Sequence, residues 1–206
     1  MRLGIFGGTF NPIHLGHLLL AETARETLRL DRVLFIPTHQ PPHKAPPDLL
    51  DGRTRLTLIK LAVRDHPAFR ASDLELRRGG VSYTVDTVRA VRRAHPRARL
   101  FLLLGQDLLR VQWKGWDELA RRCRIVVAAR ETRAPPHPAR NVTWLRMPRM
   151  EVASSEIRSR LRRGRSIRYL VPRAVERFAQ RHRLYRRSPR GATASADHQP
   201  PEGLRT

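Results

Sequence analysis

Short runs of aliphatic and β-branched residues alternate along the chain with segments whose apolar residues recur every three or four positions. The runs predict strands, and the spaced segments predict helices. Strands that are apolar at nearly every position are covered on both faces, and strands joined by helices run parallel. The predicted strands are residues 2–6, 33–36, 69–74, 100–104, 125–129 and 142–145.

The segments between these runs carry an apolar stripe on one helical face. The stripes are Leu18, Ala21, Ala24 and Leu28, then Leu56, Ile59 and Val63, then Val85, Val88 and Val91. Two more helices are expected at 155–163 and 172–182. This order predicts an α/β fold, a Rossmann-like doubly wound parallel sheet whose ligands bind beyond the carboxyl ends of the strands.

The length of 206 residues suits one domain, because a core of this size buries about 70% of the surface of the unfolded chain. Near residue 188 the periodicity ends, and the sequence becomes rich in Pro, Gly, Ser, Ala and charge, which is typical of disorder. We therefore predict a single domain over residues 1–187 and a disordered C-terminal tail over 188–206.

The cysteine content and the apolar runs bear on the compartment. Cys123 is the only cysteine, which excludes a disulfide framework and a cysteine-rich zinc module. No apolar stretch approaches the roughly 20 residues that cross a bilayer, and the apolar start breaks into Gly7 and Gly8, unlike a signal peptide. We expect a cytoplasmic protein with no membrane partner. The oligomeric state stays open, a homo-oligomer included.

The formal charge of +23, from 41 Lys and Arg against 18 Asp and Glu, would suit a polyanionic partner. Only Lys44, Lys60 and Lys114 are lysines, so nearly all of this charge is arginine spread along the chain, a bias that genome composition can produce. No recognised nucleic-acid motif or aromatic stacking platform accompanies the arginines. A nucleic-acid-binding module is therefore the disfavoured alternative.

The turn between the first strand and the first helix predicts a phosphate site. Gly7 and Gly8 let the backbone approach an anion, and the helix start offers free N–H groups and the positive end of the helix dipole. The turn lacks the sequences of a P-loop and of a dinucleotide oxidoreductase. His14 and His17, three residues apart, lie on one side of the first helical turn, where they could donate to phosphate oxygens. An isolated pair of this spacing is more often capping or packing.

The string from Gly7 to His17, GGTFNPIHLGH, resembles the signature of the HIGH-type nucleotidyltransferases. The segments PPHK (41–44), SYT (82–84), GQD (105–107), WKGW (113–116) and VASSEIR (152–158) resemble those of bacterial nicotinate-nucleotide adenylyltransferases, in the same order. The resemblance covers residues 3–185. It implies that the phosphate of nicotinate mononucleotide attacks the α-phosphorus of ATP, giving nicotinate adenine dinucleotide and pyrophosphate on the route to NAD.

The resemblance also implies a binding site for ATP, the donor of the adenylyl group. The candidate catalytic residues are His14 and His17, on the ATP phosphates, and Lys44, which would swing toward those phosphates from its proline-rich loop. The other candidate ATP-binding residues are Gly7, Gly8, Thr9, Phe10, Gly105, Asp107, Ser154, Ser155, Ile157 and Arg158. Mg²⁺ is expected to arrive on the phosphates of ATP, with no protein metal site.

Each of these assignments has a structural alternative. Ser154 and Ser155 could simply begin a helix that leaves Arg158 exposed, Asp107 could cap residues 108–111, and Lys44 could be a solvated loop lysine. The chain also departs from the family pattern. Ala153 stands where the family usually has serine, and Asn11 stands where it often has aspartate, which argues against a metal or base role for Asn11.

The candidate residues for nicotinate mononucleotide are Lys44, Ser82, Tyr83, Thr84 and Trp113. Residues 82–84 are expected to begin the third helix, whose free N–H groups and Thr84 hydroxyl favour the nicotinate carboxylate over neutral nicotinamide. Trp113 would stack on the pyridine ring, whereas Trp116 would belong to the core. Nicotinamide mononucleotide and phosphopantetheine remain as alternative acceptors, and residues 82–84 and Trp113 argue against the second.

Overall fold

The computed structural model describes residues 1–42, 47–106, 108, 113–129 and 142–186. Lys44, Asp107 and the predicted tail over 188–206 lie outside these residues, so the expectations for them remain untested. Within the described part of the chain, no helix is long and apolar enough to span a membrane.

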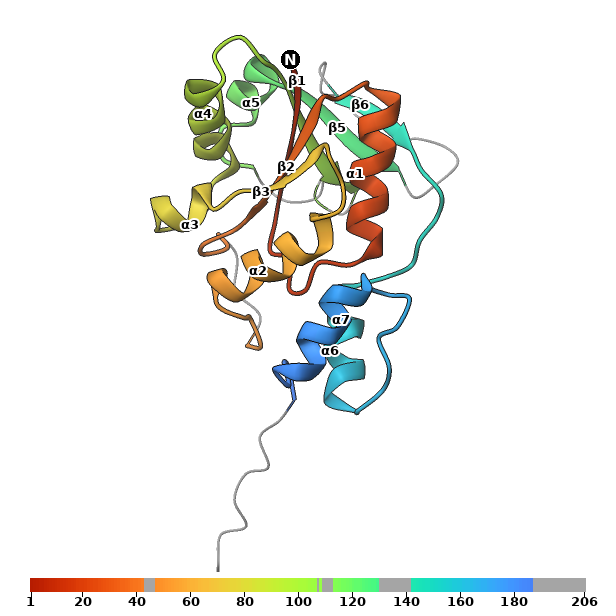
Figure 1. The fold of residues 1–206 in the computed structure, drawn as a ribbon. Helices are drawn as coiled ribbons and strands as arrows, with labels where there is room; N and C mark the ends of the chain where they lie inside the picture. The colour runs from red at the N-terminus through yellow and green to blue at the C-terminus, as the bar shows by residue number, and fades with distance from the viewer. Residues whose placement is uncertain (43–46, 107, 109–112, 130–141, 187–206) are drawn as a thin grey trace, which may run out of the picture.

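Six parallel strands form one sheet in the order β3-β2-β1-β4-β5-β6 (Figure 1). The order reverses between β1 and β4. Leu3 of β1, in the middle of the sheet, pairs with Arg32 of β2 on one side and with Leu100 of β4 on the other. This arrangement confirms the predicted Rossmann-like doubly wound fold. The strands are β1 (Arg2–Gly8), β2 (Arg32–Pro37), β3 (Phe69–Ala71), β4 (Arg99–Gly105), β5 (Arg124–Ala129) and β6 (Val142–Arg146).

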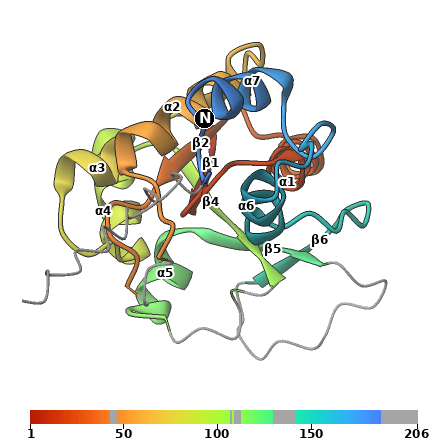
Figure 2. The same ribbon diagram turned by 90° about the horizontal axis from the view of Figure 1, so that it is seen from below.

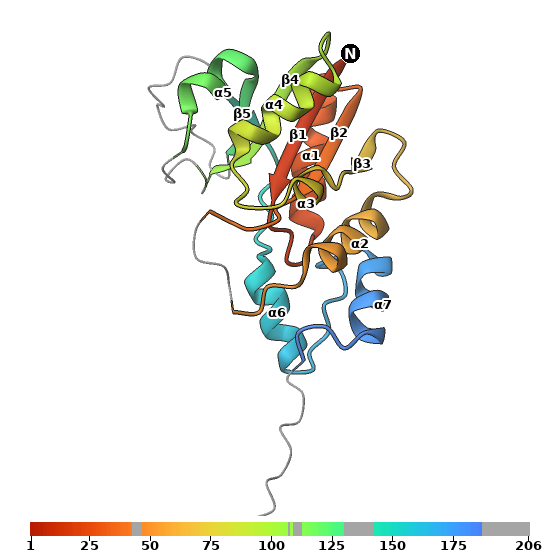
Figure 3. The same cartoon turned by 90° about the vertical axis from the view of Figure 1, so that its left-hand side faces the viewer.

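Helices cover both faces of the sheet. Figure 2 shows α4 and α5 on one side of the strands and α1 on the other, and Figure 3 shows α2, α6 and α7 toward the end at which β1 points. The helices are α1 (Leu15–Thr27), α2 (Gly52–Val63), α3 (Leu74–Arg78), α4 (Thr84–Ala94), α5 (Trp116–Arg122), α6 (Ser154–Arg162) and α7 (Arg173–Arg181).

The central strand β4 shows why its sequence is apolar throughout. Leu100, Leu102 and Leu104 belong to the cluster beneath α4 and α5, whereas Phe101 and Leu103 belong to the cluster beneath α1. Successive side chains of a strand point to opposite faces, so a strand covered on both sides needs an apolar residue at every position.

Two local expectations were wrong in detail. The predicted strand over 69–74 ends at Ala71, and Leu74 begins α3. Ser72 and Asp73 lie between them, and the Ser72 hydroxyl accepts a weak hydrogen bond from the Leu74 N–H at 3.4 Å; such side chains compete with a ladder and favour a turn. In α2 the buried apolar residues are Leu58, Ile59 and Val63, while the predicted Leu56 is half-buried.

Candidate active site

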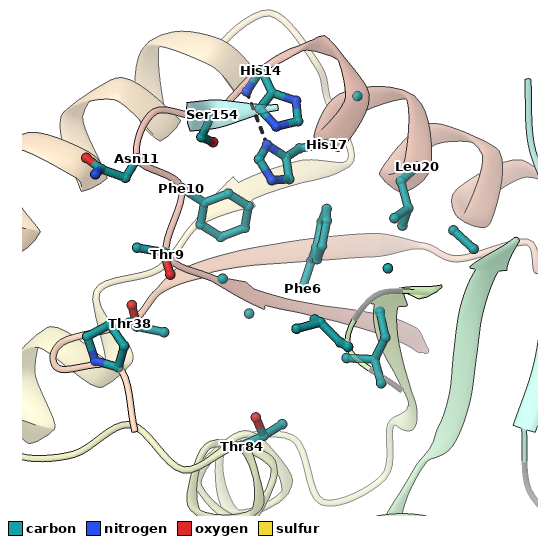
Figure 4. A pocket seen from close by; sticks show the side chains of 18 of the residues that line it. Phe6, Thr9, Phe10, Asn11, His14, His17, Leu20, Thr38, Thr84 and Ser154 are labelled. Atoms are coloured by element: carbon teal, nitrogen blue, oxygen red, sulfur yellow. Dashed lines mark hydrogen bonds between the residues drawn. The ribbon is translucent and has the colours of Figure 1, made fainter. Parts of the chain in front are cut away.

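A cavity of about 680 Å³ opens at the carboxyl edge of the sheet. The ends of β1, β2 and β4 supply Gly7, Gly8, Thr38 and Gly105 to its wall. This is the edge at which ligands of doubly wound sheets bind, and the volume is typical of a small-molecule site. Figure 4 shows two opposite walls, with His14, His17 and Ser154 on one and Thr84 on the other.

The turn after β1 leaves room for a ligand at Gly7. A Cβ atom added there would meet nothing within 4 Å, so the backbone of Gly7 borders open space of the cavity. At Gly8 an added Cβ would lie 3.2 Å from the ring of Phe10. Phe10 adopts a φ of 47° and is buried, so its side chain anchors the turn; a contact of Phe10 with the nucleotide remains a prediction.

His14 and His17 are brought together on the cavity wall. Their rings stack with centroids 3.7 Å apart. The main-chain N–H of His14 donates to Nδ1 of the His17 ring at 3.2 Å (Figure 4). Desolvation by burial, and then the neighbouring His14, hold the pKa of His17 well below the usual value of 6.5. Because Nδ1 accepts a hydrogen bond, the neutral ring carries its proton on Nε2, which makes His17 an uncharged donor at pH 7.

Gly16 makes this histidine pair fit, a role that the motif analysis missed. An added Cβ at Gly16 would lie 3.1 Å from Nδ1 of His14, a tight contact that would require the His14 ring to move by a few tenths of an ångström. The only signal in the sequence was the place of Gly16 between the two histidines, because the position of the His14 ring depends on the tertiary structure.

The start of α6 brings to the cavity only two of the four ATP-binding residues predicted there. Ser154 and Arg158 line the cavity, and the Ser154 hydroxyl donates to the carbonyl of Pro12 at 2.9 Å. Ser155 is exposed and lies outside the lining. Ile157 is fully buried in the core, so its side chain does not border the cavity.

Arg158 is already paired within the protein. Its Nε donates to Asp48 at 2.9 Å, and its Nη1 donates to the carbonyl of Asn11 at 3.0 Å. Burial alone would raise the pKa of Asp48, but hydrogen bonds from Arg158 and Arg162 outweigh it and lower the pKa. Asp48 is therefore charged at pH 7 and forms an ion pair with Arg158. A bidentate contact of Arg158 with a phosphate of ATP remains a prediction.

Asn11 joins distant segments of the chain. It is buried, its Nδ2 donates to the carbonyl of Asp48 at 3.1 Å, and its Oδ1 accepts from the Leu50 N–H and from the Tyr185 hydroxyl. These three hydrogen bonds give Asn11 a structural role, and the absence of a base or metal role at this residue remains a prediction.

The opposite wall contains the predicted acceptor residues. Ser82, Tyr83, Thr84 and Trp113 all line the cavity, and α4 begins at Thr84, as residues 82–84 predicted. The Ser82 hydroxyl accepts from the His39 N–H at 2.9 Å. Trp113 donates its ring N–H to the carbonyl of Leu108 at 2.8 Å, which orients the indole.

Trp116 packs partly buried against the core and does not line the cavity, which confirms the expectation for that residue.

Arg55 holds together the main-chain segments that border the site, a role that the sequence did not reveal. Its side chain is 1% exposed and donates to the carbonyls of Leu50 at 2.8 Å, Thr9 at 2.8 Å and Thr38 at 2.7 Å. Burial lowers the pKa of Arg55, yet an arginine stays protonated at neutral pH. The guanidinium thereby ties the ends of β1 and β2 to the start of α2.

The remaining wall is apolar and comes largely from the segment before α6. It includes Met147, Met150 and Val152, together with Leu20 and Ala128. Among the described residues, no group of three or more His, Cys, Asp or Glu side chains is placed to hold a metal ion.

Comparison with known proteins identifies relatives along most of the chain. A family model described as cytidylyltransferase-like matches residues 5–160. A Thermus thermophilus protein named "probable nicotinate-nucleotide adenylyltransferase" is 47% identical over 192 residues, which cover 90% of this chain and 100% of that protein. A Geobacter sulfurreducens protein of the same name is 40% identical, covering 90% and 98%.

A solved structure shares the fold. The nicotinic acid mononucleotide adenylyltransferase of Plasmodium falciparum, in complex with NaAD, superposes with a TM-score of 0.75 at 16% identity, covering 89% of this chain and 97% of that one. At this identity the match supports the architecture alone.

Proposed function

The chain belongs to the cytidylyltransferase-like family and, within it, to the nicotinate-nucleotide adenylyltransferases, and from that premise we propose how its cavity transfers the adenylyl group of ATP to nicotinate mononucleotide. The products are nicotinate adenine dinucleotide and pyrophosphate. The observation that carries the assignment of the two substrates is the pair of facing walls, with phosphate donors on one side and the start of α4 on the other.

The reaction needs no protein nucleophile. An oxygen of the acceptor phosphate is already anionic and attacks the α-phosphorus of ATP, while the bond from that phosphorus to the bridging oxygen breaks and pyrophosphate leaves. The protein must hold two polyanions in line and stabilise the charge that develops on the transferred and departing groups. Neutral and cationic donors suit that demand.

ATP binds at the wall formed by the turn after β1 and the start of α6. Gly7 leaves space for the phosphates, and Nε2–H of His17 donates to the oxygens around the α-phosphorus. The first turn of α6 adds main-chain N–H groups and the positive end of its dipole. The apolar segment with Met147, Met150 and Val152 suits the adenine ring.

The donor is expected to enter as MgATP. Membership of the nucleotidyltransferases supports this expectation, because these enzymes generally use a divalent metal ion bound to the phosphates of the nucleotide. Magnesium commonly binds through such phosphates with few protein ligands. The part of this wall that the structure describes offers imidazole, hydroxyl, guanidinium and main-chain groups, which can bind the remaining phosphate oxygens.

Nicotinate mononucleotide binds at the opposite wall. The N-terminus of α4 faces the cavity at Thr84, and its N–H groups and hydroxyl suit the nicotinate carboxylate. Trp113, oriented by its bond to Leu108, offers an indole face to the pyridine ring. Nicotinamide mononucleotide has a neutral amide in place of this carboxylate, so it lacks the negative charge that the helix N-terminus favours.

Replacing Thr84 with valine should weaken nicotinate mononucleotide binding more than ATP binding. Valine is nearly isosteric with threonine, so the change removes a hydroxyl donor without opening a cavity. A hydrogen bond to a charged group contributes roughly 1.5–3 kcal/mol, so the KM of the acceptor should rise about tenfold or more, measured by steady-state kinetics with each substrate varied.

The preference for nicotinate over nicotinamide mononucleotide should shrink but survive, because the helix N–H groups remain. Thr57→Val on α2, outside the cavity lining, is the matched control and should leave both KM values unchanged. Equal losses for ATP and acceptor, or no loss, would assign Thr84 a capping role only.

A pyrophosphate-release assay with MgATP and nicotinate mononucleotide, run beside a salt titration of nucleic-acid binding, separates the enzyme from the alternative of a basic nucleic-acid-binding module. The enzyme should release pyrophosphate only when both substrates are present. Tight, steeply salt-dependent nucleic-acid binding without pyrophosphate release would favour the alternative.

A further inference from the structure

Two buried polar atoms of cavity-lining residues have no role in the site described above. They are Oε2 of Glu75 and Oγ1 of Thr38, and neither has a hydrogen-bond partner in the part of the chain that the structure describes. A buried acceptor without a partner costs about 1–3 kcal/mol, so native proteins rarely keep one without a reason. Because both residues border the same cavity, a bound ligand is the natural partner.

Glu75 is held so that only one of its carboxylate oxygens remains for a ligand. The residue lies on α3 and is 4% exposed. Its Oε1 accepts from the Thr87 hydroxyl at 2.5 Å, and Nη1 of Arg78 donates to that hydroxyl at 3.2 Å. Thr87 is buried on α4, one turn beyond Thr84. The carboxylate is therefore fixed beside the acceptor wall with Oε2 uncommitted.

Thr38 is fixed through its main chain. Its N–H donates to the carbonyl of Gly8 at 3.0 Å, and its own carbonyl accepts from Arg55 at 2.7 Å. Figure 4 shows its side chain on the wall between Thr9 and Thr84. The position of the hydroxyl is thus set by the ends of β1 and β2, between the phosphate wall and the acceptor wall.

The chemistry of the acceptor restricts what can meet a carboxylate there. The phosphate and the nicotinate carboxylate of the mononucleotide are anionic acceptors, and its only hydrogen-bond donors are the two ribose hydroxyls. A carboxylate suits two adjacent hydroxyls, as it does for the ribose of dinucleotides in folds of this class. A carboxylate facing either anionic group would instead repel the substrate.

We propose that Glu75, assisted by Thr38, binds the ribose hydroxyls of nicotinate mononucleotide. The proposal rests on the acceptor assignment made above. The ribose links the pyridine ring to the phosphate, so its place between Thr84 and the histidines matches the place of Thr38 on the wall. Glu75 would then select an acceptor with an intact ribose and hold its phosphate in line with ATP.

The test combines a side-chain change with ligand changes. Wild type and Glu75→Gln are assayed with nicotinate mononucleotide and with its 2′-deoxy and 3′-deoxy analogues, at saturating MgATP. Glutamine keeps the shape of the side chain and removes the charge. Wild type should lose about tenfold or more in kcat/KM with at least one deoxy analogue. Glu75→Gln should lose a similar factor with the ribose acceptor and should discriminate against that analogue much less.

The matched control is Glu26→Gln near the end of α1, an exposed glutamate outside the cavity lining, which should behave like wild type. The KM for ATP should stay unchanged in Glu75→Gln. If that variant does not fold, Thr38→Val is measured in the same way, because it removes the second unpartnered oxygen. A smaller loss of discrimination between the ribose and deoxyribose substrates is expected.

An identical loss for the ribose and deoxy acceptors would overturn the proposal, because Glu75 would then act only through the fold. A change confined to the nicotinate against nicotinamide preference would also overturn it, since Glu75 would then face the pyridine substituent. Failure of the proposed function has a different signature: wild type itself would form no dinucleotide from nicotinate mononucleotide.

Discussion

Replacing His17 with alanine should lower kcat by about 10²–10³-fold in a protein that still folds. His17 is the uncharged donor on the phosphate wall, and loss of one such donor from a preorganised site typically costs that factor. His17 lies on the cavity wall and is not a member of either core cluster, so removal of its ring leaves the core of the sheet intact. Steady-state kinetics and a thermal melt on the same sample measure both quantities.

His17→Gln is the informative companion variant. Its side-chain amide is also a neutral donor near the place of Nε2–H, so it should retain more activity than alanine. Wild-type activity should not fall as the pH is raised from 7 to 8, because the lowered pKa of His17 keeps its ring neutral over that range. A folded His17→Ala enzyme with undiminished turnover would remove the catalytic role.

The depressed pKa of His17 also links stability to pH. The unfolded chain binds a proton near the ordinary value of 6.5, whereas the folded chain resists protonation at this site. The contribution of His17 to stability is therefore complete above that value and is lost as the pH falls below it. His17→Gln should lose less stability than wild type between pH 7 and pH 5.

Replacing Arg55 with methionine should lower the free energy of unfolding by about 3–5 kcal/mol. The change leaves three partly buried main-chain carbonyls, of Thr9, Thr38 and Leu50, without their shared donor. Each unsatisfied buried acceptor costs about 1–3 kcal/mol. For a chain of this length the melting temperature should fall by roughly 10 °C, as measured by thermal denaturation.

Arg53→Met is the matched control on the same helix. Arg53 is exposed, and substitutions at such surface positions usually change stability by less than about 0.5 kcal/mol. Arg55→Lys keeps the charge, but an ammonium group cannot donate to all three carbonyls as the planar guanidinium does. The stability of this variant should therefore lie between those of wild type and Arg55→Met. Equal melting temperatures for the two methionine variants would show that Arg55 does not hold the turn.

Local periodicity predicted most of this fold because the strands and long helices encode it directly. The continuous apolar run of β4, which is buried on both faces, and the stripe of Val85, Val88 and Val91 on α4 are both visible in the sequence. The short helix α3 was missed because five residues carry no helical period. The end of β3 was missed because the turn at Ser72 and Asp73 prevailed over a run that looked like a strand.

The site was predictable where a motif is contiguous and unpredictable where distant segments meet. Gly7, His14 and His17 share one turn and were recognised together. Nothing in the sequence singles out Arg55, because it is buried only where the ends of β1 and β2 meet the start of α2. Glu75 likewise acquires its place in the cavity wall from the packing of α3 near α4.

The most direct test incubates the full chain with MgATP and either nicotinate or nicotinamide mononucleotide and measures the dinucleotide product itself. We predict that nicotinate adenine dinucleotide forms in one-to-one amount with pyrophosphate, and that kcat/KM for nicotinate mononucleotide is well above that for nicotinamide mononucleotide. Absence of dinucleotide with both acceptors, or a preference for nicotinamide mononucleotide, would contradict this prediction.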